Sequence, residues 1–160
     1  MKKTRYISLH NFVSAHPAMK QAVIWGTKLL PGVVYVSYPA MLVYLLLTGG
    51  DLLRGILVPG AGFLLCTLLR AGINAPRPYE KLDLPSITPK ETRGKSFPSR
   101  HAACGAVIAV TALGLCPPLG WVLLGVSLLI PLSRVLAGVH FIRDVICGWL
   151  LGALVGLLAL

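Results

Sequence analysis

Long apolar segments alternate with short polar or turn-forming breaks along most of this chain. Four hydrophobic runs occupy residues 32–48, 53–71, 102–116 and 119–137, and a fifth extends from about residue 141 to the C-terminus. A helix needs about 20 apolar residues to cross the hydrocarbon core of a bilayer, and about 17 suffice. The third run is short and must include flanking residues. The pattern predicts an all-α, polytopic membrane helix bundle with about five transmembrane helices.

The breaks between the runs predict how the helices are connected. Residues 48–51 and 116–120 contain glycine or proline and form turns that join their neighbours into antiparallel hairpins. Between residues 72 and 100, prolines and charged residues replace the apolar pattern. A long loop inside a small domain is more often functional than idle. We therefore expect residues 72–100 to form an active-site loop.

The first thirty residues have a mixed pattern. Apolar residues recur there at helical spacing and polar residues lie between them: Ala18, Met19, Ala22, Val23, Trp25, Leu29 and Leu30 against Lys20, Gln21, Thr27 and Lys28. This favours an N-terminal amphipathic helix within residues 1–30 that lies in the membrane interface. The alternative is an additional span that runs into Pro31 and Gly32, which the two lysines oppose.

Composition agrees with a membrane protein. Of the 160 residues, 56% are hydrophobic and 12% are charged, whereas soluble domains carry about 25% charged residues. The length leaves room for a single membrane domain, residues 1–160. The net charge of +10 lies mainly beside apolar runs, which fits anionic lipid headgroups or a phosphorylated substrate and argues against nucleic acid. The cysteines lie in apolar runs without the spacing of metal ligands, so no metal site is expected.

A polar cluster lies between the last two runs. Ser133, Arg134, His140 and Asp144 stand close together where the flanking sequence is strongly apolar. Ionisable groups are expensive inside a membrane and are placed where they have partners or a water-filled pocket. On a continuous helix, His140 and Asp144 would share a face, and the carboxylate could orient the imidazole. The cluster predicts a functional site, and the alternative is a structural hydrogen bond between helices.

Two further segments carry candidate anion-binding residues. Arg70 ends a predicted helix and Arg77 begins the loop, and guanidinium groups match phosphate oxygens. Arg70 taken alone could instead extend to lipid headgroups. Ser99 directly precedes an apolar helix, where it can cap the N-terminus and leave backbone N–H groups for an anion. His101 lies in the first turn, and Arg100 beside it could equally be a solvated loop charge.

Hairpin topology brings these segments together. If the helix over residues 53–71 runs toward one membrane face, the loop over residues 72–100 lies at that face. The helix over residues 119–137 then returns to the same face, and the last helix leaves from it. We therefore expect all three polar segments to converge although they are distant in sequence.

The order and spacing of the three segments resemble a known family. Arg-x6-Arg-Pro starting at Arg70, Pro-Ser-x-His ending at His101 and Ser-Arg-x5-His-x3-Asp ending at Asp144 are similar to the three-part signature of the type 2 phosphatidic acid phosphatase (PAP2) superfamily, in its branch of membrane lipid phosphate phosphatases. The resemblance covers about residues 50–160. Arg70 stands where the family usually has lysine, and Arg100 replaces a usual glycine.

The resemblance implies a role for each matching residue. His140 would attack phosphorus and form a phosphohistidine, and Asp144 would orient it. His101 would protonate the leaving oxygen and then activate water. The phosphate oxygens would be bound by the other residues of the pattern, which are Arg70, Arg77, Ser99, Arg100 and Arg134. No metal or other cofactor is expected.

The expected function is a membrane-embedded lipid phosphatase. Phosphatidic acid, phosphatidylglycerol phosphate and polyprenyl diphosphates all fit as substrates, because each joins a phosphate group to an apolar tail. A lipid phosphotransferase with the same intermediate and a non-catalytic protein that binds lipid phosphates are the alternatives. The expected partners are the lipid phosphate and the bilayer, without nucleic acid, and no oligomeric state is predicted.

Two indications of the location of the site conflict. Apart from Arg54, the lysines and arginines map to the face of the predicted site, and the positive-inside rule would make that face cytoplasmic. Several of these residues serve substrate binding in the resemblance, however, and membrane members of the family usually act on the extracytoplasmic face. A multi-pass protein of the cell membrane with an extracytoplasmic site is therefore favoured.

Overall fold

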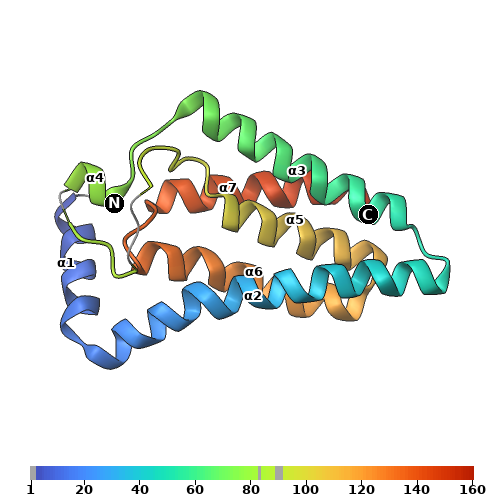
Figure 1. Ribbon diagram of the computed structural model, residues 1–160, viewed down its shortest axis with the longest axis horizontal. Helices are drawn as coiled ribbons and strands as arrows, with labels where there is room; N and C mark the ends of the chain where they lie inside the picture. Colours follow the sequence, from blue (N-terminus) through green and yellow to red (C-terminus); the bar gives the residue numbers. More distant parts are fainter. Residues whose placement is uncertain (1–2, 83, 89–91) are drawn as a thin grey trace.

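The structure is helical throughout the part that it describes. The computed structural model describes residues 3–82, 84–88 and 92–160, and no strand occurs among them. Its elements, in chain order, are α1 (Lys3–Ala15), α2 (Pro17–Thr48), α3 (Leu52–Ile73), α4 (Pro78–Leu82), α5 (Arg100–Leu115), α6 (Pro117–Leu136), α7 (Ile142–Gly156) and the 3₁₀ turn η1 (Leu157–Ala159). The helices α2, α3, α5, α6 and α7 run along a common axis (Figure 1). The predicted all-α membrane bundle is confirmed.

Four segments of the described chain are long and apolar enough to cross a bilayer. They are Pro17–Thr48, Leu52–Leu82, Pro117–Leu136 and Ile142–Ala159. Helix α5, which contains most of the short third run, is an apolar helix of 16 residues. It lies in the middle of the bundle and packs against α2, α3, α6 and α7 (Figure 1). Because other helices surround α5, most of its side chains are buried against protein.

Glycines on α7 allow it to lie against α5 at close range. A Cβ atom added at Gly152 would lie 2.1 Å from the carbonyl oxygen of Ala103, and one at Gly148 would lie 2.5 Å from that of Ser99. No side chain fits such a gap without a shift of backbone. Small residues at helix interfaces in membranes allow this kind of approach. The contact also fixes the start of α5 relative to the start of α7.

Replacing Gly152 by alanine is expected to destabilise the bundle. The added methyl group must push α7 away from the Ala103 carbonyl, and overpacking of this kind costs about 1–3 kcal/mol. Gly125→Ala is the matched control, because no atom lies within 4 Å of a Cβ added at that position on α6. Thermal unfolding in detergent should show a lower melting temperature for Gly152→Ala alone. Equal melting temperatures for the two variants would contradict this packing.

The N-terminal third differs from its predicted boundaries. The residues expected to form a separate interfacial helix, 18–30, continue without a break into the predicted span over residues 32–48 as the single helix α2. A helix of 32 residues is about 48 Å long, which exceeds the hydrocarbon core of about 30 Å. The break comes earlier, at His16, because Pro17 disfavours a helical conformation of the residue before it. Helix α1 lies across the end of the bundle (Figure 1).

Prolines inside the helices leave backbone carbonyls free for other helices. Proline has no N–H to donate to the carbonyl four residues earlier. Pro31 therefore releases the carbonyl of Thr27, which accepts a hydrogen bond of 3.1 Å from Arg134 Nη2 on α6. Pro59 likewise releases the carbonyl of Gly55, which accepts a 3.1 Å hydrogen bond from the hydroxyl of Tyr38 on α2. These prolines are tolerated because neighbouring helices satisfy the free carbonyls.

Candidate active site

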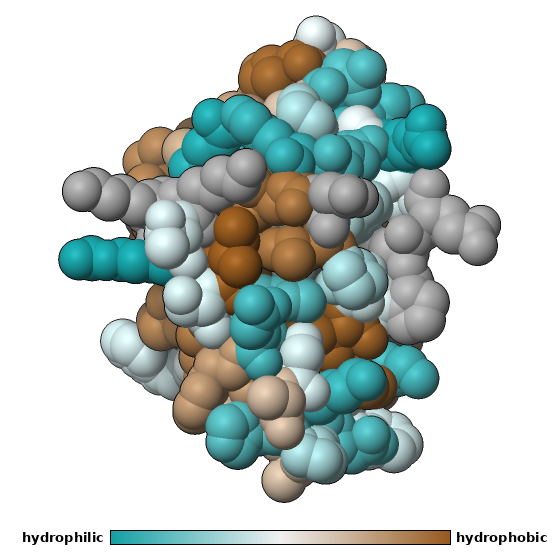
Figure 2. All heavy atoms as spheres, turned by 90° about the vertical axis from the view of Figure 1, so that its left-hand side faces the viewer, coloured by the Kyte–Doolittle hydropathy of each residue, from teal (hydrophilic) through white to brown (hydrophobic). Residues whose placement is uncertain are grey.

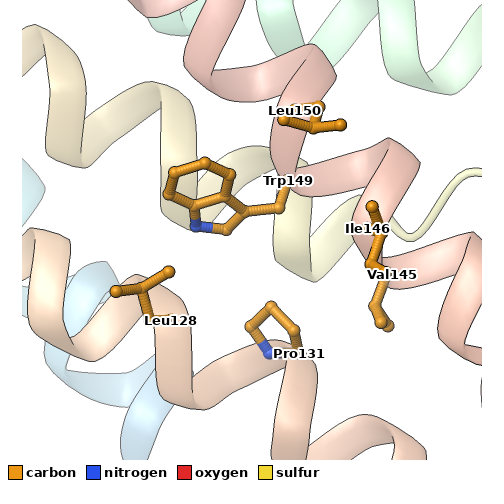
Figure 3. A pocket seen from close by; sticks show the side chains of 6 residues that line it. All are labelled: Leu128, Pro131, Val145, Ile146, Trp149 and Leu150. Atoms are coloured by element: carbon orange, nitrogen blue, oxygen red, sulfur yellow. The ribbon is translucent and has the colours of Figure 1, made fainter.

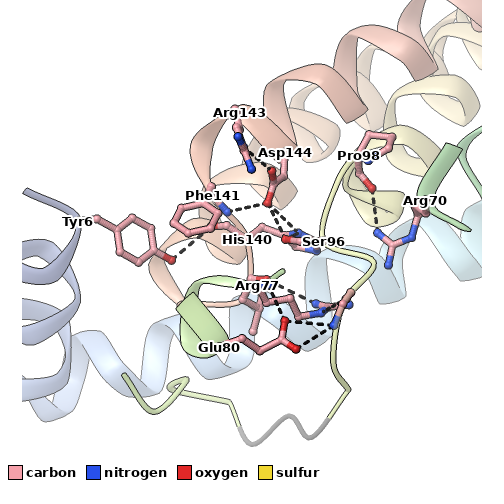
Figure 4. A network of polar contacts seen from close by, with 12 residues as sticks. Tyr6, Arg70, Arg77, Glu80, Ser96, Pro98, His140, Phe141, Arg143 and Asp144 are labelled. Carbon is pink, nitrogen blue, oxygen red and sulfur yellow. Dashed lines mark hydrogen bonds and ion pairs between the residues drawn. The ribbon is translucent and has the colours of Figure 1, made fainter. Parts of the chain in front are cut away.

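The three predicted segments converge at one end of the bundle. The end of α3, the loop after α4, the start of α5, the end of α6 and the start of α7 all meet there (Figures 1 and 4). Six of the eight predicted site residues are buried, namely Arg70, Arg77, Ser99, Arg134, His140 and Asp144. His101 is half-buried and Arg100 is exposed. The topological expectation of one shared face therefore holds.

His140 lies in a turn and not on a helix. Helix α6 ends at Leu136, and Gly138 adopts a positive φ of 77°, which redirects the chain before α7 begins at Ile142. The expectation that His140 and Asp144 share a face of a continuous helix is therefore wrong. Asp144 reaches the site from the first turn of α7, where its Oδ2 accepts the N–H of Phe141 at 3.0 Å.

A serine hydroxyl connects His140 with Asp144. The distance between His140 Nδ1 and Asp144 Oδ2 is 3.8 Å, too long for a direct hydrogen bond. Ser96 Oγ donates to Asp144 Oδ2 at 2.6 Å and lies 3.3 Å from His140 Nδ1 (Figure 4). Ser96 was not predicted as a site residue, since a serine in a long polar loop has no spacing that distinguishes it. The structure adds it to the set that orients the imidazole.

The surroundings of His140 favour a neutral imidazole. Burial lowers the pKa of His140 to about 4, and the neighbouring Asp144 opposes only part of this effect. At neutral pH the ring is therefore uncharged. With Asp144 and Ser96 on the Nδ1 side, the proton is best placed on Nδ1, which leaves the lone pair of Nε2 available. A neutral imidazole with a free lone pair is a nucleophile.

Three buried arginines are held by backbone carbonyls. Arg70 Nη1 donates to the carbonyl oxygen of Pro98 at 2.8 Å, and Arg77 Nε donates to that of Gly94 at 3.1 Å. Arg134 Nη2 donates to the carbonyl oxygen of Thr27 at 3.1 Å. Within the described residues, none of the three forms an ion pair with a carboxylate. Their positive charges are thus fixed in place but not neutralised. Such a cluster favours a bound anion.

Two buried donors among the predicted site residues have no hydrogen-bond partner in the described structure. They are Nε of Arg134 and the hydroxyl of Ser99. Ser99 is the N-cap residue of α5, as expected, but its side chain forms no capping hydrogen bond. The backbone N–H of Ser99 instead donates to the Asp144 carbonyl at 2.8 Å, which leaves the hydroxyl unused. Buried polar groups normally have partners, and a bound phosphate would supply one for each.

Glu80 closes the loop that carries Arg77 and Ser96. Its carboxylate accepts the backbone N–H groups of Arg77 at 2.7 Å and of Gly94 at 2.9 Å (Figure 4). Gly94 has a positive φ of 62°, and a Cβ atom there would lie 2.4 Å from Asn74 Oδ1.

Among the described residues, no group of three or more His, Cys, Asp and Glu side chains could hold a metal ion.

An open cleft begins beside His101 and runs along α5. It has a volume of about 520 Å³ and is lined by residues of α2, α3 and α5: Tyr35, Tyr38, Pro59, Gly60, Phe63, Arg100, His101, Cys104 and Ile108. Arg100 does not join the three buried arginines. Its guanidinium carbon lies 5.5 Å from the centre of the Phe63 ring, at the wall of this cleft. The cleft is therefore charged at the His101 end and largely apolar further along.

A smaller hollow of about 200 Å³ lies between α6 and α7 (Figure 3). Its lining is apolar and consists of Leu128, Pro131, Val145, Ile146, Trp149 and Leu150. The indole N–H of Trp149 donates to Ser127 Oγ at 3.1 Å. Nothing in this lining can bind a phosphate, so the hollow is not part of the candidate site.

Helix α1 supports the turn that carries His140. The hydroxyl of Tyr6, which is buried, donates to the His140 carbonyl at 3.3 Å, and the Tyr6 ring lies 5.5 Å from that of Phe141 (Figure 4). Burial also raises the pKa of Tyr6. The hydroxyl therefore stays protonated and remains a donor. Tyr6 is thus a positioning residue for His140.

Replacing Tyr6 by phenylalanine is expected to lower kcat about fivefold, which corresponds to one net hydrogen bond of about 1 kcal/mol. KM should change little, since Tyr6 bonds to the turn that carries His140 and is not among the arginines predicted to bind phosphate. Tyr44→Phe is the matched control, because Tyr44 is exposed on α2. Steady-state kinetics on a lipid phosphate would separate the two parameters. A parallel change in KM, or none in kcat, would contradict the positioning role.

Comparison with known proteins agrees with this geometry. The sequence model of the PAP2 superfamily matches residues 51–160. The chain belongs to the PAP2 superfamily. It is accordingly a hydrolase of the PAP2 phosphatase type, and its apolar helices make it a multi-pass membrane protein. The matched region starts at the turn before α3 and contains all eight predicted site residues.

Similar proteins are known as sequences and as structures. An undecaprenyl-diphosphatase of Sulfolobus acidocaldarius is 43% identical over 75 residues, which is 46% of this chain and 35% of that protein. The match thus spans about a third of the relative. The crystal structure of Aquifex aeolicus LpxE is similar with a TM-score of 0.73 and 27% identity, covering 96% of this chain and 93% of that one. A transmembrane PAP2 type phosphatidylglycerolphosphate phosphatase from Bacillus subtilis has a TM-score of 0.59 and 25% identity, with 98% and 90% covered.

Proposed function

We propose that the protein removes a phosphate group from a membrane lipid through a phosphohistidine on His140. The observation that carries the proposal is a buried, neutral imidazole placed among arginines that have no carboxylate partner in the described part of the chain. Asp144 and Ser96 orient the ring from its Nδ1 side. Nε2 then attacks phosphorus, and the developing imidazolium is stabilised by Asp144.

The remaining residues bind and protonate the phosphate. Arg70, Arg77 and Arg134, with the hydroxyl of Ser99, neutralise negative charge on the non-bridging oxygens. Positioning and electrostatic stabilisation are the main contributions to catalysis of phosphoryl transfer. His101 serves as the general acid for the leaving oxygen and then as the general base for water. Its place at the mouth of the cleft supports this role, since the leaving group must lie there.

The depth of the site in the membrane supports a lipid substrate. Arg134 is bound to the carbonyl of Thr27, and the apolar stretch of α2 begins two residues later at Leu29. Trp25 is 52% exposed just before it, as expected for a side chain at a membrane interface. Hydrophilic side chains surround the end of the bundle that carries the site, with hydrophobic ones exposed between them (Figure 2). A phosphate bound by Arg134 would therefore lie at the boundary between water and hydrocarbon.

The cleft beside His101 would hold the hydrocarbon tail. From Arg100 to Ile108 it follows two turns of α5, about 12 Å along the helix axis. Tyr38 and Phe63 give it an aromatic and apolar lining away from the charged end. A lipid whose phosphate is near His140 can place its tail there without exposing it to water. The lining of this cleft is where selection between tails is expected.

The relatives narrow the candidate substrates. One carries the name undecaprenyl-diphosphatase and another is a phosphatidylglycerolphosphate phosphatase, so both a diphosphate and a monophosphate ester occur among similar proteins. A polyprenyl diphosphate is the first candidate for this chain, because the site end is rich in arginine and the sequence-similar relative is a diphosphatase. Phosphatidic acid and phosphatidylglycerol phosphate are the other two.

A phosphate-release panel tests the proposal. The full-length protein in detergent micelles would be incubated with these three lipids, and inorganic phosphate would be measured over time. Release from at least one lipid by the parent, without added metal, supports a phosphatase. Transfer of phosphate to an added lipid alcohol without release would instead indicate a phosphotransferase. Absence of both activities would leave only lipid phosphate binding and would refute the proposal.

We further propose that the site faces the extracytoplasmic side, as the active sites of membrane members of the family usually do. Arg93 is exposed in the loop at the site, and Thr48 is exposed at the opposite end of α2. Arg93→Cys should therefore react with a membrane-impermeant maleimide in intact cells, and Thr48→Cys only after permeabilisation, with the parent chain as the blank. The reverse pattern would place the site on the cytoplasmic side.

A further inference from the structure

Arg100 stands apart from the other arginines of the site. It is the first residue of α5, directly before His101, and its side chain is exposed. The guanidinium group lies over the ring of Phe63 on α3, a contact that holds a cation at an aromatic face. No carboxylate within the described residues forms an ion pair with it. A positive charge is therefore held at the wall of the cleft, next to the proposed general acid.

The position of Arg100 relative to the reacting phosphate determines what it can bind. In the proposed mechanism, the three buried arginines and Ser99 bind one phosphoryl group near His140. Arg100 lies at the wall of the cleft that begins beside His101, with its guanidinium group over the ring of Phe63. The part of the substrate in that place is the group attached to the leaving oxygen. In a simple phosphate monoester this group is uncharged carbon, and in a diphosphate it is a second phosphate.

We propose that Arg100 binds the second phosphate of a lipid diphosphate, the one that stays on the lipid. This rests on the proposed phosphatase function and deepens it. Nε2 of His140 forms a bond to the terminal phosphorus, and the bond from that phosphorus to the bridging oxygen breaks. The electron pair stays on the bridging oxygen, which takes the proton of His101 and leaves as part of a lipid monophosphate. Arg100 stabilises the negative charge of this leaving group.

The second half of the reaction needs only water. The water oxygen attacks the phosphorus of the phosphohistidine, the bond to Nε2 breaks, and His101 takes the proton of the water. Inorganic phosphate and the lipid monophosphate are the products. Once the first half of the reaction has passed, Arg100 has no further part in hydrolysis. Its removal should therefore affect formation of the intermediate and leave its hydrolysis alone.

Arg100→Gln tests this assignment. The matched control is Arg54→Gln, because Arg54 lies at the start of α3, whereas the site lies at the end of that helix. The two variants and the parent would be assayed on a polyprenyl diphosphate and on the monophosphate with the same tail, in the same micelles. The ratio of kcat/KM for diphosphate over monophosphate should fall about tenfold in Arg100→Gln, as expected for loss of one charge-assisted contact. Arg54→Gln should keep the parental ratio, and Arg100→Lys should restore part of it.

A second readout is independent of the lipid. Pyrophosphate and inorganic phosphate would be compared as competitive inhibitors, and only the inhibition constant of pyrophosphate should rise about tenfold in Arg100→Gln. An equal loss for both substrates and both inhibitors, or no loss for any, would overturn the assignment and leave Arg100 as a headgroup contact. Complete inactivity of the parent on both lipids would instead refute the proposed function.

Discussion

Replacing His140 by alanine is expected to abolish phosphate release from lipid substrates. If this imidazole is the nucleophile, no other group in the described site can form the covalent intermediate at the same place. Removal of a nucleophile in other hydrolases costs about 10⁶-fold in kcat. We therefore expect activity at the background rate, measured by phosphate release and by trapping of a phosphorylated protein after acid-free quenching.

The control for this experiment is His16→Ala, since His16 is an exposed histidine between α1 and α2. It should keep both the parental rate and the trapped phosphoprotein. Binding of the lipid phosphate to His140→Ala should persist, because the arginines are unchanged. A variant that still releases phosphate above background would exclude His140 as the nucleophile. Parental turnover equal to that of the variant would indicate a protein that only binds lipid phosphates.

Hydropathy was sufficient to predict the bundle but not the boundaries of its helices. The runs over residues 53–71, 102–116 and 119–137 correspond closely to α3, α5 and α6. The failure is in α2, where the sequence predicted a separate helix within residues 1–30 and a span that starts at residue 32. A proline interrupts a helix unless something satisfies the carbonyl it releases, and Arg134 on α6 does so at Thr27. That compensation comes from a residue far away in sequence, so no local pattern could indicate it.

The candidate site could be predicted in composition and only partly in geometry. The spacing of the three segments identified the residues that the fold brings to one end, because hairpin directions follow from the turns. The expectation that His140 and Asp144 lie on one continuous helix was wrong, since α6 ends at Leu136 and the chain turns at Gly138 before α7 begins. Ser96 was missed for a related reason. Its position depends on the path of the loop, which Glu80 fixes through backbone contacts.

Arg100 shows where a departure from the family pattern becomes informative. From sequence alone, a side chain in place of the usual glycine could crowd the phosphate or add a cation to it. The structure turns the side chain toward Phe63, away from the buried arginines. Glycine could not have filled that place in the cleft. The difference from the family therefore lies in what the site can recognise beyond the transferred phosphate.

Replacing His101 by alanine is expected to separate the two halves of the reaction. Loss of a general acid and base lowers rates by about 10²–10⁴-fold. A lipid phosphate has a poor leaving group and needs the proton, so both formation and hydrolysis of the intermediate should slow. With p-nitrophenyl phosphate the leaving group is p-nitrophenolate, which departs without protonation. With this substrate, the variant should still phosphorylate His140 and then stall, because nothing activates the attacking water.

The measurement is a rapid-mixing assay of p-nitrophenol release. His101→Ala should give a burst of about one equivalent per protein followed by very slow turnover, with a phosphorylated protein that accumulates. The parent and His16→Ala should show continuous turnover and little trapped intermediate. A variant with slow turnover and no burst would mean that His101 is needed to position the phosphate. Continuous turnover near the parental rate would remove His101 from the mechanism and leave proton transfer to solvent at the mouth of the cleft.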